Sequence, residues 1–346
     1  MDAGERLNAA NLLNRNLHTL ATARISGGFC RLVWLLLCIH CIVGFAGCRA
    51  IRNHRQSREQ GAARQMSLRG AEALQQQKYS DAESLFGEAI RQSPVDERAQ
   101  WGYAEVLWHR GQYQPAIEHM TKAVATSGGN PDLVVRLGQM YLEQNELLRA
   151  AEQAEVALNL QRNHAGAWAL KGDVVRQRRQ QGYLDEALAC YHRSLIHRSD
   201  SPQVQVALAE LYRQQGRPQR ALATLDHLED HHAAEQVPPR AWLLKGQALA
   251  DMGENSEAKR YFRLASQYAG ETQSGLLLEL ASVQHEFGDL AEARLCLGRV
   301  LQHEPGNPGA LQLQNQLDQS FVRMAADQSE KVPAMQVPYQ RNPTPQ

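Results

Sequence analysis

The chain has 346 residues with 37 basic and 37 acidic side chains, so its formal net charge at pH 7 is zero. This balance gives no overall reason to expect a nucleic acid as a partner, because nucleic-acid-binding domains usually carry excess positive charge. Aromatic residues make up only 6% of the chain. Alanine, leucine, glutamine and arginine are abundant, which favours helices over sheets.

The first feature in chain order is an apolar run at the end of region 1–48. Its apolar core is roughly fifteen residues long, shorter than the roughly 20 that a spanning helix needs. Arginines precede it and small residues follow it, which is typical of an export signal. Phe45-Ala46-Gly47-Cys48 resembles the lipobox of bacterial lipoproteins. The resemblance implies a signal peptide that is cut before Cys48, with lipids then attached to this cysteine.

Two other interpretations of the N-terminal region stay open. One is an uncleaved anchor that ends at Cys48, because Phe45 stands where leucine is usual and the leading region is long. The other is a soluble protein. Under the lipoprotein interpretation, Arg49 after the cysteine implies the outer membrane of a bacterium, facing the periplasm. Under the anchor interpretation, the chain is a single-pass protein of the inner membrane. Region 49–62 is polar, contains four arginines, and is expected to be a linker.

From residue 63 onward, one helical pattern repeats along the chain. In each copy an alanine marks the second helix, and successive alanines are separated by 34, 34, 37, 34, 37 and 35 residues. These alanines are Ala82, Ala116, Ala150, Ala187, Ala221, Ala258 and Ala293. A period in the mid-thirties is typical of stacked helical hairpins.

Two further positions recur with the alanine. A small residue precedes it by twelve positions, or by fifteen at Gly172, where 178–180 reads as an extension. This residue marks where the first helix crosses the second. The position five residues before each alanine is expected to form a left-handed turn that ends the first helix. It is glycine in most copies, with Gln77 and Asn145 as exceptions.

Each copy therefore reads as helix, tight turn, helix, and this pattern resembles the tetratricopeptide repeat family. The two fullest copies carry Trp168, Gly172, Ala187 and Tyr191, and Trp242, Gly246, Ala258, Phe262 and Ala265. The resemblance implies an all-α, right-handed superhelical solenoid of about seven helix-turn-helix units over 63–306. A capping helix is expected over 307–324. The proline-rich tail 325–346 is expected to be disordered.

The resemblance also implies that the first helices line a concave side, where relatives bind peptides or extended segments of partner proteins. The small residues set the register of that side. The candidate partner-binding residues are Trp101, Glu105, Trp108, His109, Glu143, Asp173, Arg176, Glu210 and Arg213. For Trp101, filling the core is an open alternative. A C-terminal carboxylate is an unlikely target, because the lysine- and asparagine-rich clamp of some relatives is absent from these helices.

No pattern indicates catalysis, a metal or a cofactor. The histidine-containing stretch Asp226–Pro239 lacks an HExxH frame and is expected to be a solvated loop. Cys190 and Cys296 occupy equivalent places three units apart, so no disulfide is expected between them. The sequence thus predicts a membrane-tethered scaffold or adaptor that binds proteins and has no catalysis of its own. The alternative is a single-pass protein whose cytoplasmic repeats regulate or assemble a complex.

Overall fold

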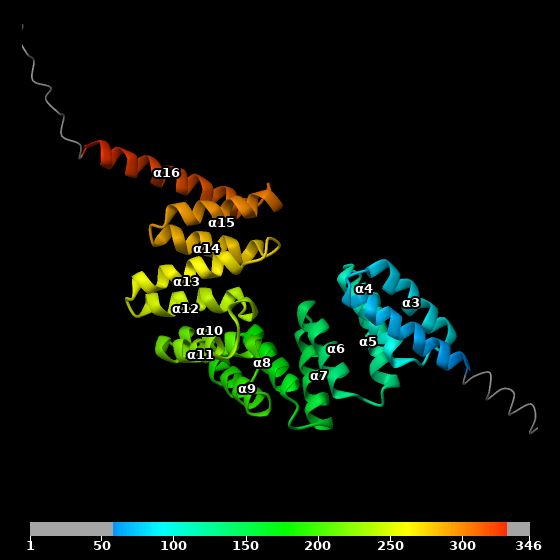
Figure 1. Cartoon of the computed structure of the whole chain (residues 1–346). Coiled ribbons are helices and arrows are strands. Elements are labelled where there is room, and N and C mark those ends of the chain that lie inside the picture. Colours follow the sequence, from blue (N-terminus) through cyan, green and yellow to red (C-terminus); the bar gives the residue numbers. More distant parts are fainter. Residues whose placement is uncertain (1–57, 331–346) are drawn as a thin grey trace, which may run out of the picture. The chain divides into compact units, whose positions relative to one another are not determined.

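The computed structural model describes residues 58–330, which form helices joined by short turns (Figure 1). No strand occurs in this part of the chain. The predicted all-α fold is therefore confirmed. The signal region 1–48, most of the expected linker 49–62 and the end of the tail lie outside the described residues.

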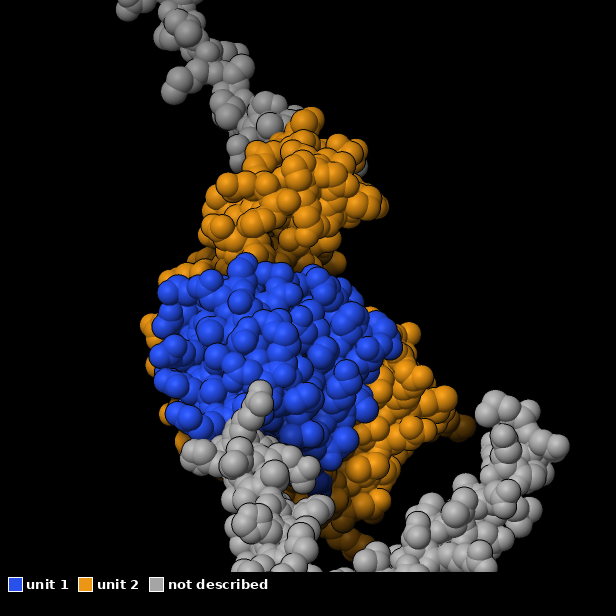
Figure 2. Space-filling view, turned by 90° about the vertical axis from the view of Figure 1, so that its right-hand side faces the viewer, with its two compact units in different colours: residues 1–128 blue, residues 129–346 orange. Residues whose placement is uncertain are grey.

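The chain divides into two compact units, Met1–Gly128 and Gly129–Gln346, which Figure 2 colours separately. The division falls between Gly128 and Gly129, both of which have positive φ. Within its described residues, the first unit contains a helix over 58–75 and the helices α3 (Tyr79–Gln92), α4 (Glu97–His109) and α5 (Tyr113–Thr126). These four helices form the first two hairpins.

The second unit contains five more hairpins and a final helix. Its first helices are α6 (Pro131–Glu143), α8 (Ala165–Arg178), α10 (Pro202–Gln214), α12 (Pro239–Asp251) and α14 (Ser274–Glu286). Its second helices are α7 (Leu147–Leu160), α9 (Tyr183–His197), α11 (Pro218–His231), α13 (Asn255–Tyr268) and α15 (Leu290–His303). A short 3-10 helix, Ala234–Gln236, precedes α12, and α16 (Pro308–Glu330) ends the described chain.

The helices extend further at both ends than the sequence predicted. The first described helix already includes residues 58–62, which were expected to belong to the linker. At the other end, α16 runs on to Glu330 instead of stopping at residue 324. The physical reason is plain in the sequence, because no glycine or proline interrupts the chain between Ala310 and Pro333.

The turns of all seven hairpins use the predicted left-handed residue. The position five residues before each alanine has φ between +57° and +85°, including the two non-glycine cases Gln77 and Asn145. In the extended hairpin, Arg179 adds a second left-handed residue that ends α8. A left-handed residue reverses the chain within a few positions, which lets the two helices of a hairpin pack side by side.

Within each unit, the core lies between the helices of each hairpin and between successive hairpins. Each of the seven repeat alanines is at most 1% exposed. Large side chains fill the space beside them, and Phe86, Tyr191 and Phe262 are almost completely buried. Trp242 is buried as well, whereas Trp168 is only half-buried and donates its indole N–H to the Arg162 carbonyl at 2.8 Å.

Gln284 of α14 is a polar exception in this core. Its side chain is 1% exposed, and neither amide atom has a hydrogen-bond partner among the described residues. The equivalent positions of α10 and α12 hold Tyr212 and Leu249, which are also buried. A buried amide without partners costs free energy, because it loses its hydrogen bonds to water on folding.

We therefore expect Gln284→Leu to raise the free energy of unfolding by about 1–2 kcal/mol. Urea denaturation followed by circular dichroism measures this difference. The control is Gln284→Ala, which removes the same amide but leaves a cavity, so it should gain less. A Leu variant no more stable than the wild type would contradict the prediction and indicate that the amide is satisfied in solution.

Candidate functional site

The candidate site is the surface formed by the first helices, called the first-helix face below. In the second unit α6 contacts α8, and α10 contacts α12, so these helices lie next to one another along the array. This arrangement places residues of equivalent register in rows across several hairpins. The candidate residues of the sequence analysis all belong to first helices, α4 in the first unit and α6, α8 and α10 in the second.

Asp173 and Arg176 lie together on α8, and Glu210 of α10 joins them rather than pairing with Arg213. The Arg176 guanidinium lies 3.7 Å from the Asp173 carboxylate on its own helix and 3.8 Å from Glu210 on α10. Tyr191 donates its hydroxyl to Asp173 at 2.7 Å, and the Arg176 Nε donates to the Tyr191 oxygen at 3.2 Å. The second helix α9 thereby holds the orientation of both charged side chains.

Two residues that the sequence reasoning missed extend this row. Arg240 of α12 lies 3.6 Å from Glu210 and also pairs with Glu279 of α14. Gln247 donates to the other oxygen of Glu279 at 3.2 Å. The result is a charge ladder of alternating sign across α8, α10, α12 and α14, made of Asp173, Arg176, Glu210, Arg240 and Glu279.

The other predicted charges of this unit form separate pairs. Arg213 lies 3.3 Å from Asp251 of the next first helix. Glu143 lies 3.3 Å from Arg136 on its own helix, α6. Exposed pairs of this kind contribute at most about 1 kcal/mol each to stability. The pairs also neutralise the positive charge of this surface, because every arginine named on this face of the second unit has an acidic neighbour.

Burial and neighbouring charges shift the pKa values of Asp173, Arg176 and Tyr191. Burial raises the pKa of Asp173, while the Tyr191 hydrogen bond and the Arg176 charge act in the opposite direction. Burial acts to lower the pKa of Arg176, but Tyr191, Asp173 and Glu210 outweigh it and raise that pKa. Burial, together with the Asp173 charge, raises the pKa of Tyr191 far above neutrality. The phenol therefore stays protonated and remains a donor.

A hollow of about 500 Å³ lies beside the ladder. It is lined by Arg176, Gln177, Arg179, Tyr183, Glu210 and Gln214. Its lining is polar, and the three-residue extension of α8 supplies Arg179. Such a surface suits polar groups of a partner rather than a buried apolar ligand.

In the first unit, Trp101 is exposed and Trp108 is not. The Trp101 side chain is 43% exposed, and its indole N–H donates to Glu105 at 3.2 Å. His109 is exposed as well, with its ring 5.2 Å from that of Tyr79. Three of the four predicted residues thus lie at the surface.

The prediction that Trp108 is exposed was wrong. Its side chain is only 9% exposed, and its ring packs edge-on against Tyr113 at 4.8 Å. Trp108 lies in the last turn of α4, and Tyr113 is the first residue of α5. The hairpin turn therefore brings Tyr113 back across the indole, which a register on one helix does not reveal.

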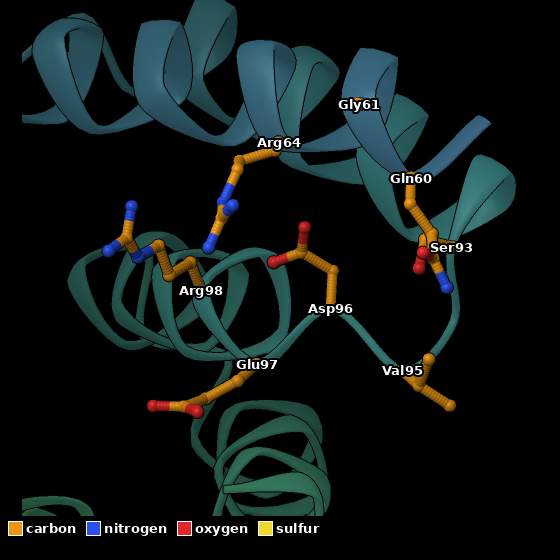
Figure 3. Close-up of a pocket in the computed structure, with 8 residues that line it drawn as sticks. All are labelled: Gln60, Gly61, Arg64, Ser93, Val95, Asp96, Glu97 and Arg98. Atoms are coloured by element: carbon orange, nitrogen blue, oxygen red, sulfur yellow. The ribbon is translucent and has the colours of Figure 1, made fainter. Parts of the chain in front are cut away.

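A cavity of about 590 Å³ lies between helix 58–75 and the start of α4 (Figure 3). Arg64 enters it from the first helix and Arg98 from α4. Asp96 also lines the cavity and caps α4 by accepting the Ala99 N–H at 2.9 Å. The sequence reasoning did not select the two arginines. The repeat pattern does mark both arginines as equivalent positions, because they are 34 residues apart and each lies six positions before a small residue.

His119 of α5 supports α4 from behind this face. Its Nδ1 lies 2.7 Å from the Gln100 amide oxygen, and its ring meets Tyr103 edge-on at 4.8 Å. Burial, aided by Lys122, lowers the pKa of His119 and outweighs the opposite effect of Glu118. Protonation of the ring therefore favours the unfolded chain, in which histidine has its ordinary pKa near 6.5.

Because protonation of His119 favours the unfolded chain, we expect the protein to be less stable at pH 5.5 than at pH 7.5. The contribution of the neutral ring is fully present above about pH 6.5 and is lost as the pH falls toward the lowered folded value. The His119→Gln variant should show a smaller difference between the thermal midpoints at the two pH values. His109→Gln, at an exposed site, should keep the wild-type difference. Equal differences in all three proteins would refute this role of His119.

No group of histidine, cysteine or acidic residues suited to a metal ion occurs within residues 58–330. His227 and His231 stack with ring centroids 4.1 Å apart, and α11 extends through both, so they belong to a helix rather than to the predicted loop. Cys190 and Cys296 are free and buried, and burial raises the pKa of each thiol. A raised pKa makes a thiol less reactive at neutral pH.

Among the described residues, no helix has the length and apolar character that crossing a membrane requires.

The fold and this face define the class of protein, a solenoid of helical hairpins with a row of first helices along one side. Tetratricopeptide repeat models match residues 68–131, 107–174, 178–248 and 239–271, which together cover more than half of the chain. The chain therefore belongs to the tetratricopeptide repeat family. Proteins of this family generally mediate protein–protein interactions and are generally non-catalytic.

Solved structures agree with the fold. A tetratricopeptide repeat protein from Parabacteroides merdae is 13% identical with a TM-score of 0.56, over 74% of this chain and 99% of that one. A chain of the APC/C hetero-tetramer Cut9–Hcn1 is 16% identical with a TM-score of 0.51, over 78% of this chain and 45% of that one. No match was found among the curated proteins.

Proposed function

We propose that this protein is a membrane-tethered scaffold that binds protein partners along its first-helix face and has no catalysis of its own. The observation that carries the proposal is Trp101, a large aromatic side chain left 43% exposed on the helix face that the array presents in rows. Exposed tryptophans at protein interfaces are frequent hot spots. In the second unit, the charge ladder supplies polar groups that fix the orientation of a segment bound there.

Crosslinking and affinity capture in cells of the source organism test the binding function. Trp101→Ala is the informative variant, because this side chain is exposed and its loss leaves the core intact. Leu295→Ala is the matched control, since Leu295 is also exposed, at 62%, but lies on a second helix, α15. We expect Trp101→Ala to lose at least one partner that the wild type and the control retain. If all three proteins capture the same partners, Trp101 is not part of the binding site.

The tether is proposed from Cys48 and the sequence before it. Labelling with a radioactive or alkyne-bearing fatty acid should mark the wild type and leave Cys48→Ser unlabelled. Membrane fractionation should then place the wild type in the outer membrane, as Arg49 after the cysteine implies. Equal labelling of the two proteins would exclude the lipoprotein interpretation. Activity of a C-terminal reporter that works only in the cytoplasm would favour the single-pass alternative.

A further inference from the structure

The first-helix faces of the two units differ in how their arginines are neutralised. In the second unit Arg136, Arg176, Arg213 and Arg240 each lie within 4 Å of a carboxylate. In the first unit, neither Arg64 nor Arg98 forms an ion pair with another described residue, although both line the same cavity. The positive charge of this pair is therefore available to a partner.

Neither acidic residue of the cavity lining, Asp96 or Glu97, forms an ion pair with Arg64 or Arg98. Asp96 accepts the Ala99 N–H as the cap of α4, and Glu97 extends away from the two arginines on the other side of that helix (Figure 3). An acidic residue in the first turn also interacts favourably with the positive end of a helix dipole. Both acids thus already serve the start of α4.

The exposed tryptophan lies on the same helix as one of the two cavity arginines. Arg64 and Arg98 hold the same register position on neighbouring first helices, and Trp101 follows Arg98 by three residues on α4. Residues three apart share a helix face. Guanidinium groups bind carboxylates through paired hydrogen bonds, and an exposed indole offers an apolar surface beside them.

We propose that this surface, made of Arg64, Arg98 and Trp101, docks an extended acidic segment of a protein partner. The inference rests on the proposed function and names the chemistry of the partner. Packed helices lie about 8–10 Å apart, and a chain in the extended polyproline II conformation advances about 3.1 Å per residue with three residues per turn. The segment therefore carries two acidic side chains about three positions apart, with an apolar residue next to them that covers Trp101.

The chain's own terminal segments do not fit this description. Asp2 and Glu5 are the only acidic residues of region 1–57, and region 331–346 contains none. Both regions carry an excess of arginine and lysine, so their charge matches that of the arginine pair. The occupant is accordingly a separate acidic segment.

A binding measurement with the full-length chain in detergent tests the proposal. The probe is a fluorescent peptide with blocked ends, in which two glutamates three positions apart precede a leucine, and the comparison peptide has glutamines instead. Fluorescence anisotropy should show binding of the glutamate peptide that weakens with salt. The Arg64→Gln/Arg98→Gln variant should weaken this binding at least tenfold, and Trp101→Ala should also weaken it. Arg69→Gln, an exposed arginine of the same helix outside the cavity, should change it less than twofold.

Each contrary outcome has a defined meaning. Equal binding of the glutamate and glutamine peptides, full binding by the double arginine variant, or no binding of the acidic probe at about 1 mM overturns the acidic-segment proposal. Capture from cells separates this from the function itself. If the wild type captures partners and the double arginine variant captures the same set, only this inference fails. If the wild type captures none, the proposed scaffold function fails with it.

Discussion

Gly246→Ala is expected to lower the free energy of unfolding by about 1–3 kcal/mol. A Cβ atom at this position would lie 2.5 Å from the Phe262 ring and 3.0 Å from the Ala258 backbone oxygen. Alanine is the better helix former by about 1 kcal/mol, so the substitution would be favourable without this contact. The overpacking outweighs that gain because the backbone oxygen and the buried ring cannot both move away.

The seven hairpins contain a rule that supports this expectation. Where glycine holds the crossing position, an aromatic ring lies against it, as in Gly70–Phe86, Gly172–Tyr191 and Gly246–Phe262. Where alanine holds it, the residue at the ring position is smaller or more flexible, as in Ala104–Met120, Ala209–Leu225 and Ala281–Leu297. The hairpin with Gly138 and Ala154 has no ring, and Leu170 of the following hairpin fills the space instead.

A double-mutant cycle measures this coupling. Gly246→Ala/Phe262→Leu copies the natural Ala209–Leu225 pair, so it should be more stable than the sum of the two single changes predicts. Urea unfolding of the four proteins gives the coupling free energy. Gly275→Ala is the control, because a Cβ there has no neighbour within 4 Å and the change should be neutral or stabilising. Strict additivity in the cycle would show that the ring and the crossing residue do not constrain each other.

The same pairs explain why so much of the fold could be predicted from the sequence. Alanine or glycine at a fixed distance from a tight turn is required wherever two helices cross closely, so each hairpin carries its own marker. Even Gln77 and Asn145 have the left-handed conformation that their position demands. Because the marker recurs seven times, the register of the first helices could be assigned before the structure was known, whereas the sequence left Trp101 open between surface and core.

Contacts between side chains of different helices could not be predicted in this way. Trp108 is covered by a residue on the other side of its turn, and a helical register contains no information about that contact. Arg240 lies in the first turn of α12, yet its two partners come from α10 and α14. The cavity at Arg64 and Arg98 likewise depends on the distance between two hairpins. These features depend on how different helices pack against one another, and the register of a single helix does not encode that packing.

Lys245→Met is expected to lower the free energy of unfolding by about 2–3 kcal/mol, the second large effect in this array. The Lys245 side chain is only 6% exposed, and its ammonium group lies 2.6 Å from Asp226 and in contact with Glu229, both on α11. It also lies 4.5 Å from the centre of the Tyr261 ring on α13. Burial alone would lower the pKa of Lys245, but hydrogen bonds to the two acids and to Tyr261 raise it, so the group stays charged at physiological pH.

Lys171 provides a matched control in the same register, one position before the crossing glycine. It pairs with Glu155 at 2.6 Å and lies 5.8 Å from the Trp168 ring, but 30% of its side chain is exposed. Water screens the second pair, so Lys171→Met should cost no more than about 1 kcal/mol. Removing the buried lysine is more costly because two carboxylates then remain close together without their cation. Converting those acids as well, in Lys245→Met/Asp226→Asn/Glu229→Gln, should therefore recover part of the loss. If the two single variants lose the same stability, burial of Lys245 is not what makes its pairs important.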